Sequence, residues 1–513
     1  MVAVSLLSRD VPADAVVAAA ASFFAVRSIL RFVFRAVPSG PRLHWNQRNE
    51  VEPCGRVLHA LVGLAPAISR MESGEPHIAC LKAARRALND PQPNCVIRFG
   101  QRTRVILGNP KDVEYVLLGE RSHTLTKPTL MRVLHPLLGP NGLVTIDDED
   151  FHTQQFRAVA PAFSPLSVKN IAATTMREHF SASVKELKTL VANAGGRSCE
   201  VNVNSHLQDV TLRVISEAAF CTPELTRLRS VFTLALDSQS PLMILGGAIY
   251  NRLPTARNRA CQACRDSISG IVNKVIAAAR ASPTPEKDKK LIDFMAENPA
   301  LTPEEILDHA CTFAFAGHET TSTALTWLLY FVAKNPVVQS KLLEELSEAF
   351  PAGGATPSMD ALRGLEYLNA VASETLRMIP PIVSLVRKCG ADVVLPGSKT
   401  FVPKGTTMLF PLYVIHRNPH VWGDDAGTFR PERWIEDPDL RSRVTPCAFM
   451  PFAAGKRACI GKDFAMQELL LGAAMLVRNF KFEWPEGQAE PIRIPSVVSR
   501  PKHPLPLRIS MRT

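Results

Sequence analysis

One cysteine near the carboxyl end of the chain, Cys459, lies in a setting that favours its thiolate form. It stands between two glycines, Gly455 and Gly461, which let the backbone approach a bound group closely. Three cations flank it: Lys456, Arg457 and Lys462. Positive charge lowers the pKa of a thiol, and an apolar helix that begins after Ile460 adds its N-terminal dipole. The sequence therefore predicts a thiolate held against a bound group.

A second motif, AGHETT at residues 316–321, interrupts a long apolar helix. Glycine, an acid and two hydroxyl residues are poor material for a helix interior, because Ser and Thr compete for backbone hydrogen bonds. We expect a kink or a widened turn there, and with it a groove. Glu319 and Thr320 would then form an acid–alcohol relay that delivers protons into that groove.

A third pattern is an ion pair of Glu374 and Arg377, which share one helical face at a spacing of three residues. Apolar residues surround them, so we expect the pair to be partly buried, and a buried pair needs further partners.

The segment from Phe452 to Gly461 resembles the haem loop of the cytochrome P-450 superfamily. It matches the pattern F-x-x-G-x-R-x-C-x-G at all five fixed positions: Phe452, Gly455, Arg457, Cys459 and Gly461. The resemblance implies that Cys459 is the axial ligand of the haem iron, the thiolate type that favours O–O cleavage. It also implies that Arg457 contacts a haem propionate and that Phe452 packs beneath the sulfur. The sequence holds no CxxCH motif, so we expect haem b without covalent attachment.

The helical motif is similar to the oxygen-activation motif of the same superfamily. The resemblance places Ala316 and Gly317 beside the haem, with O2 as co-substrate, and puts Thr320 at the position of the proton-delivering threonine. Glu319 is then its acidic partner.

Two further landmarks support the haem site in this superfamily. The resemblance makes Glu374, Arg377 and Arg433 a structural triad that holds the segment leading to the Cys459 loop. Arg387, which ends the segment PPIVSLVR after that helix, is expected at a haem propionate. The apolar residues just before it are expected to face substrate.

The chain departs from the superfamily pattern before Pro161. His152 holds the position of the usual Trp or His, but Phe156 holds the Arg position four residues later, and Arg157 follows one residue beyond. We expect His152 to approach a propionate or to be an ordinary surface histidine. The exchange at Phe156 removes one expected propionate contact.

The elements that must position these residues are mainly helical. A capping box of Thr302 and Glu305, with Pro303 at the first helical position, predicts a long helix to about Asn335. A hairpin is expected around Gly100, and a second strand-rich zone covers residues 391–411. The fold class is therefore mainly α with minor β, which agrees with the cytochrome P-450 fold. Its large helical domain and small β-rich part would hold the haem between the long helix and the Cys459 loop.

The composition narrows the class of partners. A hydrophobic content of 46% supports a large core, and no repeat or linker divides residues 38–513, so we predict a single catalytic domain. A net charge of +11 without basic–aromatic clusters or zinc-finger spacing favours a membrane or an acidic partner over nucleic acid. The 11 scattered cysteines, an odd number, suit a reducing compartment.

Residues 1–37 are predicted to anchor the domain in a membrane. Twelve residues, Ala15–Val26, are apolar except for Ser22, and Arg27, Arg31 and Arg35 follow them. Twelve is short of the roughly 20 that span a bilayer, although snorkelling arginines would lengthen the helix. The positive-inside rule leaves the catalytic domain in the cytosol, on the endoplasmic reticulum. A mitochondrial signal remains the alternative.

These features predict a monooxygenase that inserts one oxygen atom from O2 into a lipophilic substrate. The chain carries no GxGxxG, so NADPH-derived electrons are expected from a separate flavin reductase with FAD and FMN. A mitochondrial location would imply a ferredoxin instead. A haem-thiolate isomerase or dehydratase and a non-catalytic haem sensor are the alternatives, and Thr320 with Glu319 argues against both. Fatty acids, sterols and terpenoids all remain open as substrates.

Overall fold

The computed structural model describes most of the chain beyond residue 93. The described residues are 94–99, 102–119, 124–220, 225, 229–232, 251–282, 285, 289–350, 358–437, 440, 444, 446–493 and 497–512. The predicted anchor, residues 1–37, lies outside them. Within the described part, no helix combines the length and the apolarity needed to cross a bilayer.

Helices dominate, which confirms the predicted fold class. The long ones are α4 (Pro110–Leu118), α6 (Glu149–Val159), α8 (Arg177–Asn193), α9 (Val203–Phe220), α12 (Ala256–Ala281), α14 (Pro303–Lys334), α15 (Pro336–Ala349), α17 (Glu366–Met378) and α22 (Lys462–Asn479). The short ones are η2 (Thr129–Leu134), α5 (His135–Leu138), η3 (Ala160–Phe163), α7 (Pro165–Ile171), η4 (Ala172–Met176), α13 (Leu291–Ala296), α16 (Met359–Gly364), α18 (Leu412–Ile415), α19 (Pro419–Trp422), α20 (Arg433–Glu436) and η7 (Gly455–Arg457).

The strands form three small sheets. The largest has the order β1 (Cys95–Phe99), β2 (Arg102–Ile106), β7 (Thr407–Pro411) and β4 (Ser384–Lys388). The second has the order β3 (Cys199–Asn202), β9 (Pro506–Met511) and β8 (Phe480–Glu483), and the third pairs β5 (Val393–Val394) with β6 (Phe401–Val402). β1 and β2 pair antiparallel, as the predicted hairpin requires. β4 begins before the predicted strand-rich zone, because its ladder depends on the distant partner β7.

The predicted long helix is confirmed as α14. Thr302 and Glu305 form the capping box, with the Thr302 hydroxyl accepting from the Glu305 N–H, and Pro303 is the first helical residue. α14 packs against α9, α12, α17 and α22, and its side chains form much of the main hydrophobic core. The helix therefore crosses the interior of the domain.

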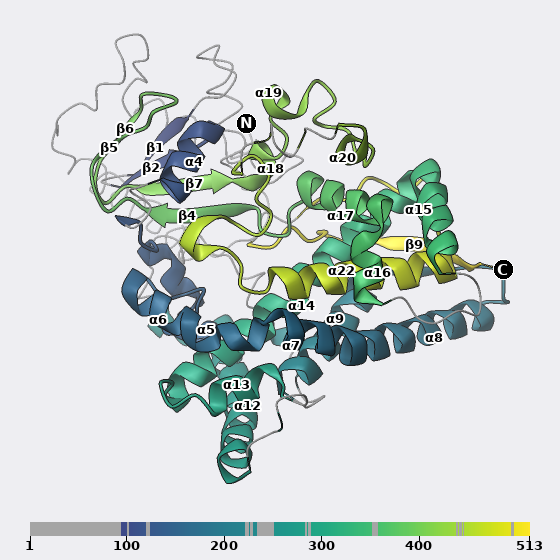
Figure 1. Cartoon of the computed structure of the whole chain (residues 1–513), viewed down its shortest axis with the longest axis horizontal. Helices are drawn as coiled ribbons and strands as arrows, with labels where there is room; N and C mark the ends of the chain where they lie inside the picture. Colours follow the sequence, from purple (N-terminus) through teal and green to yellow (C-terminus); the bar gives the residue numbers. More distant parts are fainter. Residues whose placement is uncertain are drawn as a thin grey trace, which may run out of the picture.

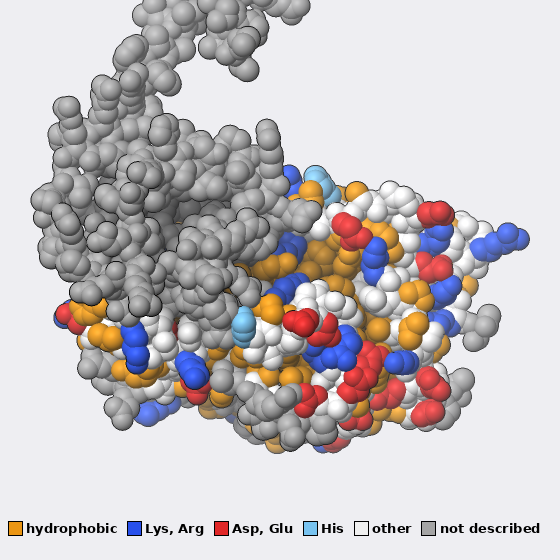
Figure 2. Space-filling model, turned by 90° about the horizontal axis from the view of Figure 1, so that it is seen from above, with side chains coloured by type: hydrophobic (Ala, Val, Ile, Leu, Met, Phe, Trp, Pro, Cys, Tyr) orange, Lys and Arg blue, Asp and Glu red, His pale blue; other side chains and the backbone are white. Residues whose placement is uncertain are grey.

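The four-stranded sheet lies at one side of the molecule, with α4 beside it, and β9 lies among the helices (Figure 1). Figure 1 shows the four-stranded sheet at the upper left, α12 and α13 at the bottom, and α22 running across the middle with α14. A separate hydrophobic cluster packs β7 and its neighbours, including Met408 and Phe410, against Val113 and Val116 of α4. In Figure 2 side chains of both charge signs are interspersed on the described surface, and hydrophobic side chains gather in a hollow beside the grey residues.

Candidate active site

The Cys459 loop is a tight turn that Gly455 and one strained residue, Ala453, make possible. Gly455 has a φ of 72° and Ala453 a φ of 62°, both in the left-handed region. A Cβ on Gly455 would lie 2.3 Å from the carbonyl oxygen of Leu117, so only glycine fits against α4. The Cys459 N–H donates to the Phe452 carbonyl at 2.9 Å and closes the loop. Helix α22 begins at Lys462, directly after the loop.

Cys459 is exposed to solvent, but its thiol is surrounded by protein. It presents surface to solvent, yet surrounding protein raises the pKa of its thiol, and a hydrogen bond from the Gly461 backbone opposes that rise. Both observations hold if the sulfur lies at the bottom of an open recess. The flanking cations do not lower its pKa as the sequence suggested, because Lys456 and Lys462 are exposed and Arg457 is paired elsewhere. A bound metal ion is the agent that can keep such a thiol deprotonated.

The centre of α14 has one accessible strip in an otherwise buried helix. Between Ile306 and Ala333 the side chains are buried except for Leu307 and three residues that share one face: Ala316, Gly317 and Thr320. The Thr320 hydroxyl donates to the Ala316 carbonyl at 2.8 Å. α14 stays continuously α-helical through this motif, so the prediction of a widened turn was wrong: the Thr320 hydroxyl makes its backbone bond without opening the helix.

Glu319 faces a buried polar cluster between α14 and α9. Its carboxylate lies 3.4 Å from His318 Nε2, 3.4 Å from Gln208 Nε2 and 3.9 Å from Arg500 Nη1. Burial raises the pKa of Glu319, but the contacts with His318, Arg500 and Gln208 outweigh it, and its pKa is lowered. The described contacts of Thr320 do not include Glu319, so the structure does not join the two residues directly.

Buried cations gather beside the Cys459 loop. Arg457 donates to Glu149 at 2.9 and 3.1 Å and to the Ile146 carbonyl at 2.9 Å. Arg387 is buried, and burial together with Arg457 lowers its pKa to about 10. Burial and the charges of Arg387 and Arg457 hold the pKa of Lys127 well below its usual range. Glu149 is the carboxylate that faces these three cations in the described part of the chain.

His152 and Lys127 are the polar residues to consider where Phe156 replaces the superfamily's Arg. His152 is buried, and burial with the nearby cations, Arg457 first, lowers its pKa to about 3, so its ring is neutral. Phe156 packs against the hydrophobic core, and Arg157 is exposed. Lys127 lies in a loop and carries no motif, so sequence patterns do not point to it. It lies near Arg387, Arg457 and Glu149.

The structure brings Glu374, Arg377 and Arg433 together. Arg377 donates two hydrogen bonds to Glu374, both of 2.8 Å, and Arg433 donates a third of 2.9 Å. All three residues are buried. Trp434 adds a bond of 3.0 Å from its ring N–H, so the carboxylate is saturated with donors.

The same cluster reaches the segment before the Cys459 loop. Arg377 donates to the carbonyls of His416, Ala426 and Thr428 at 3.0, 2.7 and 3.0 Å. His416 in turn accepts from the Met450 N–H at 3.0 Å. His416 begins the HRNP segment, residues 416–419. The triad thereby holds residues 416–428 in place, and His416 links them to Met450.

Comparison with known proteins decides the family. The family model described as cytochrome P-450 matches residues 53–508, most of the chain. This chain belongs to the cytochrome P-450 family. Cytochrome P-450 734A5 of Oryza sativa subsp. japonica is 29% identical over 79% of this chain and 77% of its own length. Cytochrome P-450 monooxygenase 205 of Postia placenta is 30% identical over 78% of this chain and 81% of its own.

The relatives also settle the class of enzyme. Besides the monooxygenase of Postia placenta, a protein named cytokinin hydroxylase from Arabidopsis thaliana is 31% identical over 66% of this chain and 66% of its own length. The chain is therefore an enzyme of the cytochrome P-450 monooxygenase type, a class that uses haem iron and O2 with separate redox partner proteins and lipophilic substrates.

The described residues fit a haem. Cys459 is exposed, and Ala316 and Gly317 are small residues on the partly accessible strip of α14. Lys127, Arg387 and Arg457 lie close together with one carboxylate, Glu149, and burial disfavours the charge of Lys127, so an added anion would stabilise the cluster. The two propionates of haem would supply that charge.

Proposed function

We propose that this cytochrome P-450 inserts one oxygen atom into a lipophilic substrate with NADPH-derived electrons from a separate FAD- and FMN-containing reductase. The cofactor in this proposal is haem b. The accessible strip of α14 carries the proposal. Its residues Ala316 and Gly317 are small and Thr320 bears a hydroxyl, whereas the helix around them is buried. An isomerase or a haem sensor does not require a hydroxyl on that strip.

Each site residue has a distinct role in this proposal. Bound haem supplies the activation of O2 and the oxidation of the substrate. Cys459 ligates the iron, with Phe452 packed beneath the sulfur. Gly455 and Gly461 let the loop approach the porphyrin. Ala316 and Gly317 leave room above it.

The propionates are proposed to bind the cation cluster. Arg457 already holds its guanidinium through Glu149 and the Ile146 carbonyl, so it is fixed before haem arrives. Arg387 and Lys127 share the single carboxylate of Glu149 with Arg457. A propionate would compensate their charges. Neutral His152 can donate one ring N–H to the same carboxylates without adding charge.

Thr320 is proposed to present a proton at its Oγ1 on the accessible strip. In the structure that hydroxyl donates to the Ala316 carbonyl, so it must turn away from that carbonyl before it can donate on the strip. Glu319 is proposed to resupply the proton. Since its pKa is lowered, it is a carboxylate near neutral pH and must first take up a proton and leave its contacts with Gln208 and His318.

The substrate is proposed to lie against apolar residues at the end of the PPIVSLVR segment. Ile382 forms an isolated bridge with Val498, which places the two stretches side by side. Val383 and Val498 are buried, whereas Ile382, Leu385 and Val497 are partly accessible. This wall supports a lipophilic substrate and does not discriminate between fatty acids, sterols and terpenoids.

The enzyme is proposed to work on the endoplasmic reticulum membrane with its catalytic domain in the cytosol. The support is the apolar run Ala15–Val26 and the three arginines after it. A mitochondrial membrane with a ferredoxin is the alternative.

Oxygen consumption tests the proposed reaction. Haem-loaded protein is mixed with NADPH and an FAD/FMN reductase, and O2 uptake is recorded with and without a lipophilic compound that shifts the haem spectrum. We expect compound-dependent uptake and an oxygenated product. Conversion of a lipid hydroperoxide without NADPH or O2 would establish the isomerase alternative instead.

A further inference from the structure

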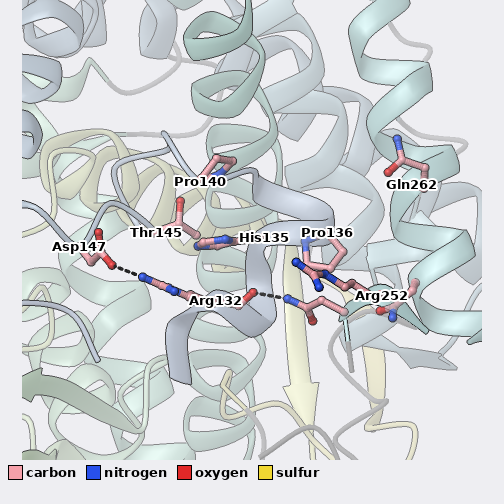
Figure 3. A pocket seen from close by; sticks show the side chains of 10 residues that line it. Arg132, His135, Pro136, Pro140, Thr145, Asp147, Arg252 and Gln262 are labelled. Carbon is pink, nitrogen blue, oxygen red and sulfur yellow. Dashed lines mark hydrogen bonds and ion pairs between the residues drawn. The ribbon is translucent and has the colours of Figure 1, made fainter. Parts of the chain in front are cut away.

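A polar hollow of about 570 Å³ opens between η2, α5 and the residues that precede α12. None of its lining residues belongs to the Cys459 loop or to α14. Its volume lies within the range of roughly 300–1,000 Å³ that small-molecule sites occupy. In Figure 3 Arg132 and His135 lie close together, with Asp147 on one side and Arg252 on the other. Two stretches of chain that lie far apart in the sequence, residues 132–147 and 251–262, therefore converge on one hollow.

Two atoms in its lining lack a partner among the described residues. His135 Nε2 and Asn251 Oδ1 are both shielded from solvent by the protein and make no hydrogen bond there. The Asn251 amide N–H donates to the Arg132 carbonyl at 2.6 Å, which fixes the amide so that its oxygen remains an acceptor. Shielded polar atoms without partners are rare in folded proteins. A ligand with hydroxyl groups would satisfy both.

The hollow also carries an excess of positive charge. Arg132 pairs with Asp147 at 3.1 Å, and both side chains are about half exposed. Arg252 is exposed and forms no ion pair within the described part of the chain. Burial, and next the charge of Arg132, lower the pKa of His135, so its ring is neutral at pH 7. Two guanidiniums therefore face one carboxylate, and Arg forks match the oxygens of a phosphate.

We propose that this hollow is a second ligand site, separate from the haem, that binds a hydroxylated phosphate ester. Arg252 and Arg132 hold the phosphate, and Asn251 Oδ1 accepts a hydrogen bond from a ligand hydroxyl. Asp147 competes with the phosphate for Arg132. A free sugar phosphate and the head group of a phosphorylated lipid share this chemistry.

The position of Asp147 links this site to the haem side of the molecule. The carbonyls of its two neighbours, Ile146 and Asp148, accept from Arg457 at 2.9 and 3.4 Å. A ligand that separates Arg132 from Asp147 therefore acts on the segment that holds Arg457.

Isothermal titration of the haem-loaded full chain with glycerol 3-phosphate at low salt tests the site. Arg252→Gln is expected to weaken binding about tenfold, because it removes a charge-assisted hydrogen bond. Asp147→Asn is expected to tighten binding severalfold, because it frees Arg132. Arg280→Gln is the matched control, since Arg280 is an exposed arginine in the last turn of α12, and its affinity should equal that of the wild type.

Vesicles distinguish the two sources of the phosphate. Phosphatidylcholine vesicles with and without phosphatidylinositol 4-phosphate are compared, and Arg252-dependent binding to the second kind alone assigns the site to a lipid head group. Titration with glycerol 3-phosphate that shows the same variant pattern assigns it to a soluble ester. The proposal is overturned if neither probe binds, if Arg280→Gln weakens binding as much as Arg252→Gln, or if glycerate binds as tightly as glycerol 3-phosphate. The carbon monoxide spectrum of each variant reports haem loading separately, so a failure here leaves the monooxygenase proposal untouched.

Discussion

At the scale of residues, two positions of this chain behave differently from what their neighbours in sequence suggest. The cations beside Cys459 do not lower the pKa of its thiol, because two of them are exposed and Arg457 is held by Glu149. Lys127, in contrast, carries no motif and yet joins the buried cations. The motif Cys and Thr positions could be predicted from spacing alone. Lys127 could not, because its role depends on which distant charges the fold places beside it.

The Thr320 hydroxyl is expected to couple electron use to product formation. Thr320→Ala should still bind haem and substrate but should release more peroxide per NADPH, since acid–base groups contribute about 10²–10⁴-fold. The measurement is product formed and peroxide released per NADPH consumed. Thr326→Ala is the control, because Thr326 makes the same backbone hydrogen bond in a fully buried part of α14. Equal ratios in both variants would make Thr320 a packing residue.

Lys127 is expected to strengthen haem binding and to lower the stability of the haem-free protein. Its lowered pKa means that its charge is disfavoured in the folded chain, so Lys127→Met should leave the apoprotein at least as resistant to urea as the wild type. The same variant should lose haem faster to an excess of apomyoglobin. Lys111→Met, at an exposed lysine of α4, should change neither quantity. An unchanged rate of haem loss in Lys127→Met would remove Lys127 from the propionate site.

At the scale of elements, the sequence predicted the helices better than the sheets. The capping box and Pro303 fixed the start of α14, because those signals are local. β4 was missed, because its ladder with β7 joins residues far apart in sequence. The widened turn expected in α14 does not form, because α14 is α-helical throughout the motif, and the Thr320 hydroxyl bonds to the Ala316 carbonyl within it. Hydroxyl residues alone are therefore a weak signal for a broken helix.

The cluster of Glu374, Arg377 and Arg433 is expected to be needed for haem incorporation. Glu374→Ala leaves two buried guanidiniums without their carboxylate, and breaking such a pair costs about 3–5 kcal/mol. We expect the variant to accumulate as haem-free or unfolded protein, measured by haem content and the urea midpoint. Glu436→Ala removes a carboxylate from an exposed ion pair of Arg430 and should behave as the wild type. Normal haem content in Glu374→Ala would show that the cluster is dispensable.

His416 is expected to make the fold sensitive to acid. Burial, with Arg377 next, lowers its pKa to about 3 from 6.5, so the unfolded chain binds a proton there before the folded chain does. Stability is then fully present above about pH 6.5 and falls as pH drops toward 3. Urea midpoints at about pH 7 and pH 5 should differ less in His416→Gln than in the wild type. Exposed His420 supplies the control, and a His420→Gln variant with the same flattening would assign the effect elsewhere.

At the scale of the whole molecule, the proposed haem site draws on three parts of the chain that lie far apart in the sequence. The Cys459 loop precedes α22, the accessible strip belongs to α14, and the buried cations come from residues 127, 387 and 457. Motifs in the sequence pointed to Cys459, the α14 residues, Arg387 and Arg457, whereas Lys127 became clear only when the fold placed it near the two arginines. The triad of Glu374, Arg377 and Arg433 holds the segment that leads to the Cys459 loop.

The ligation of haem iron by Cys459 is the central claim, and the carbon monoxide spectrum tests it most directly. The chain offers a matched control in Cys447, a buried thiol whose pKa burial raises to about 12. Reduced wild-type protein with carbon monoxide should show the red-shifted Soret band of thiolate ligation. We expect Cys447→Ser to keep that band and Cys459→Ser to lose it while other folded-state measures persist. A Cys459→Ser protein that keeps the band, or a Cys447→Ser protein that loses it, would contradict the assignment of the ligand.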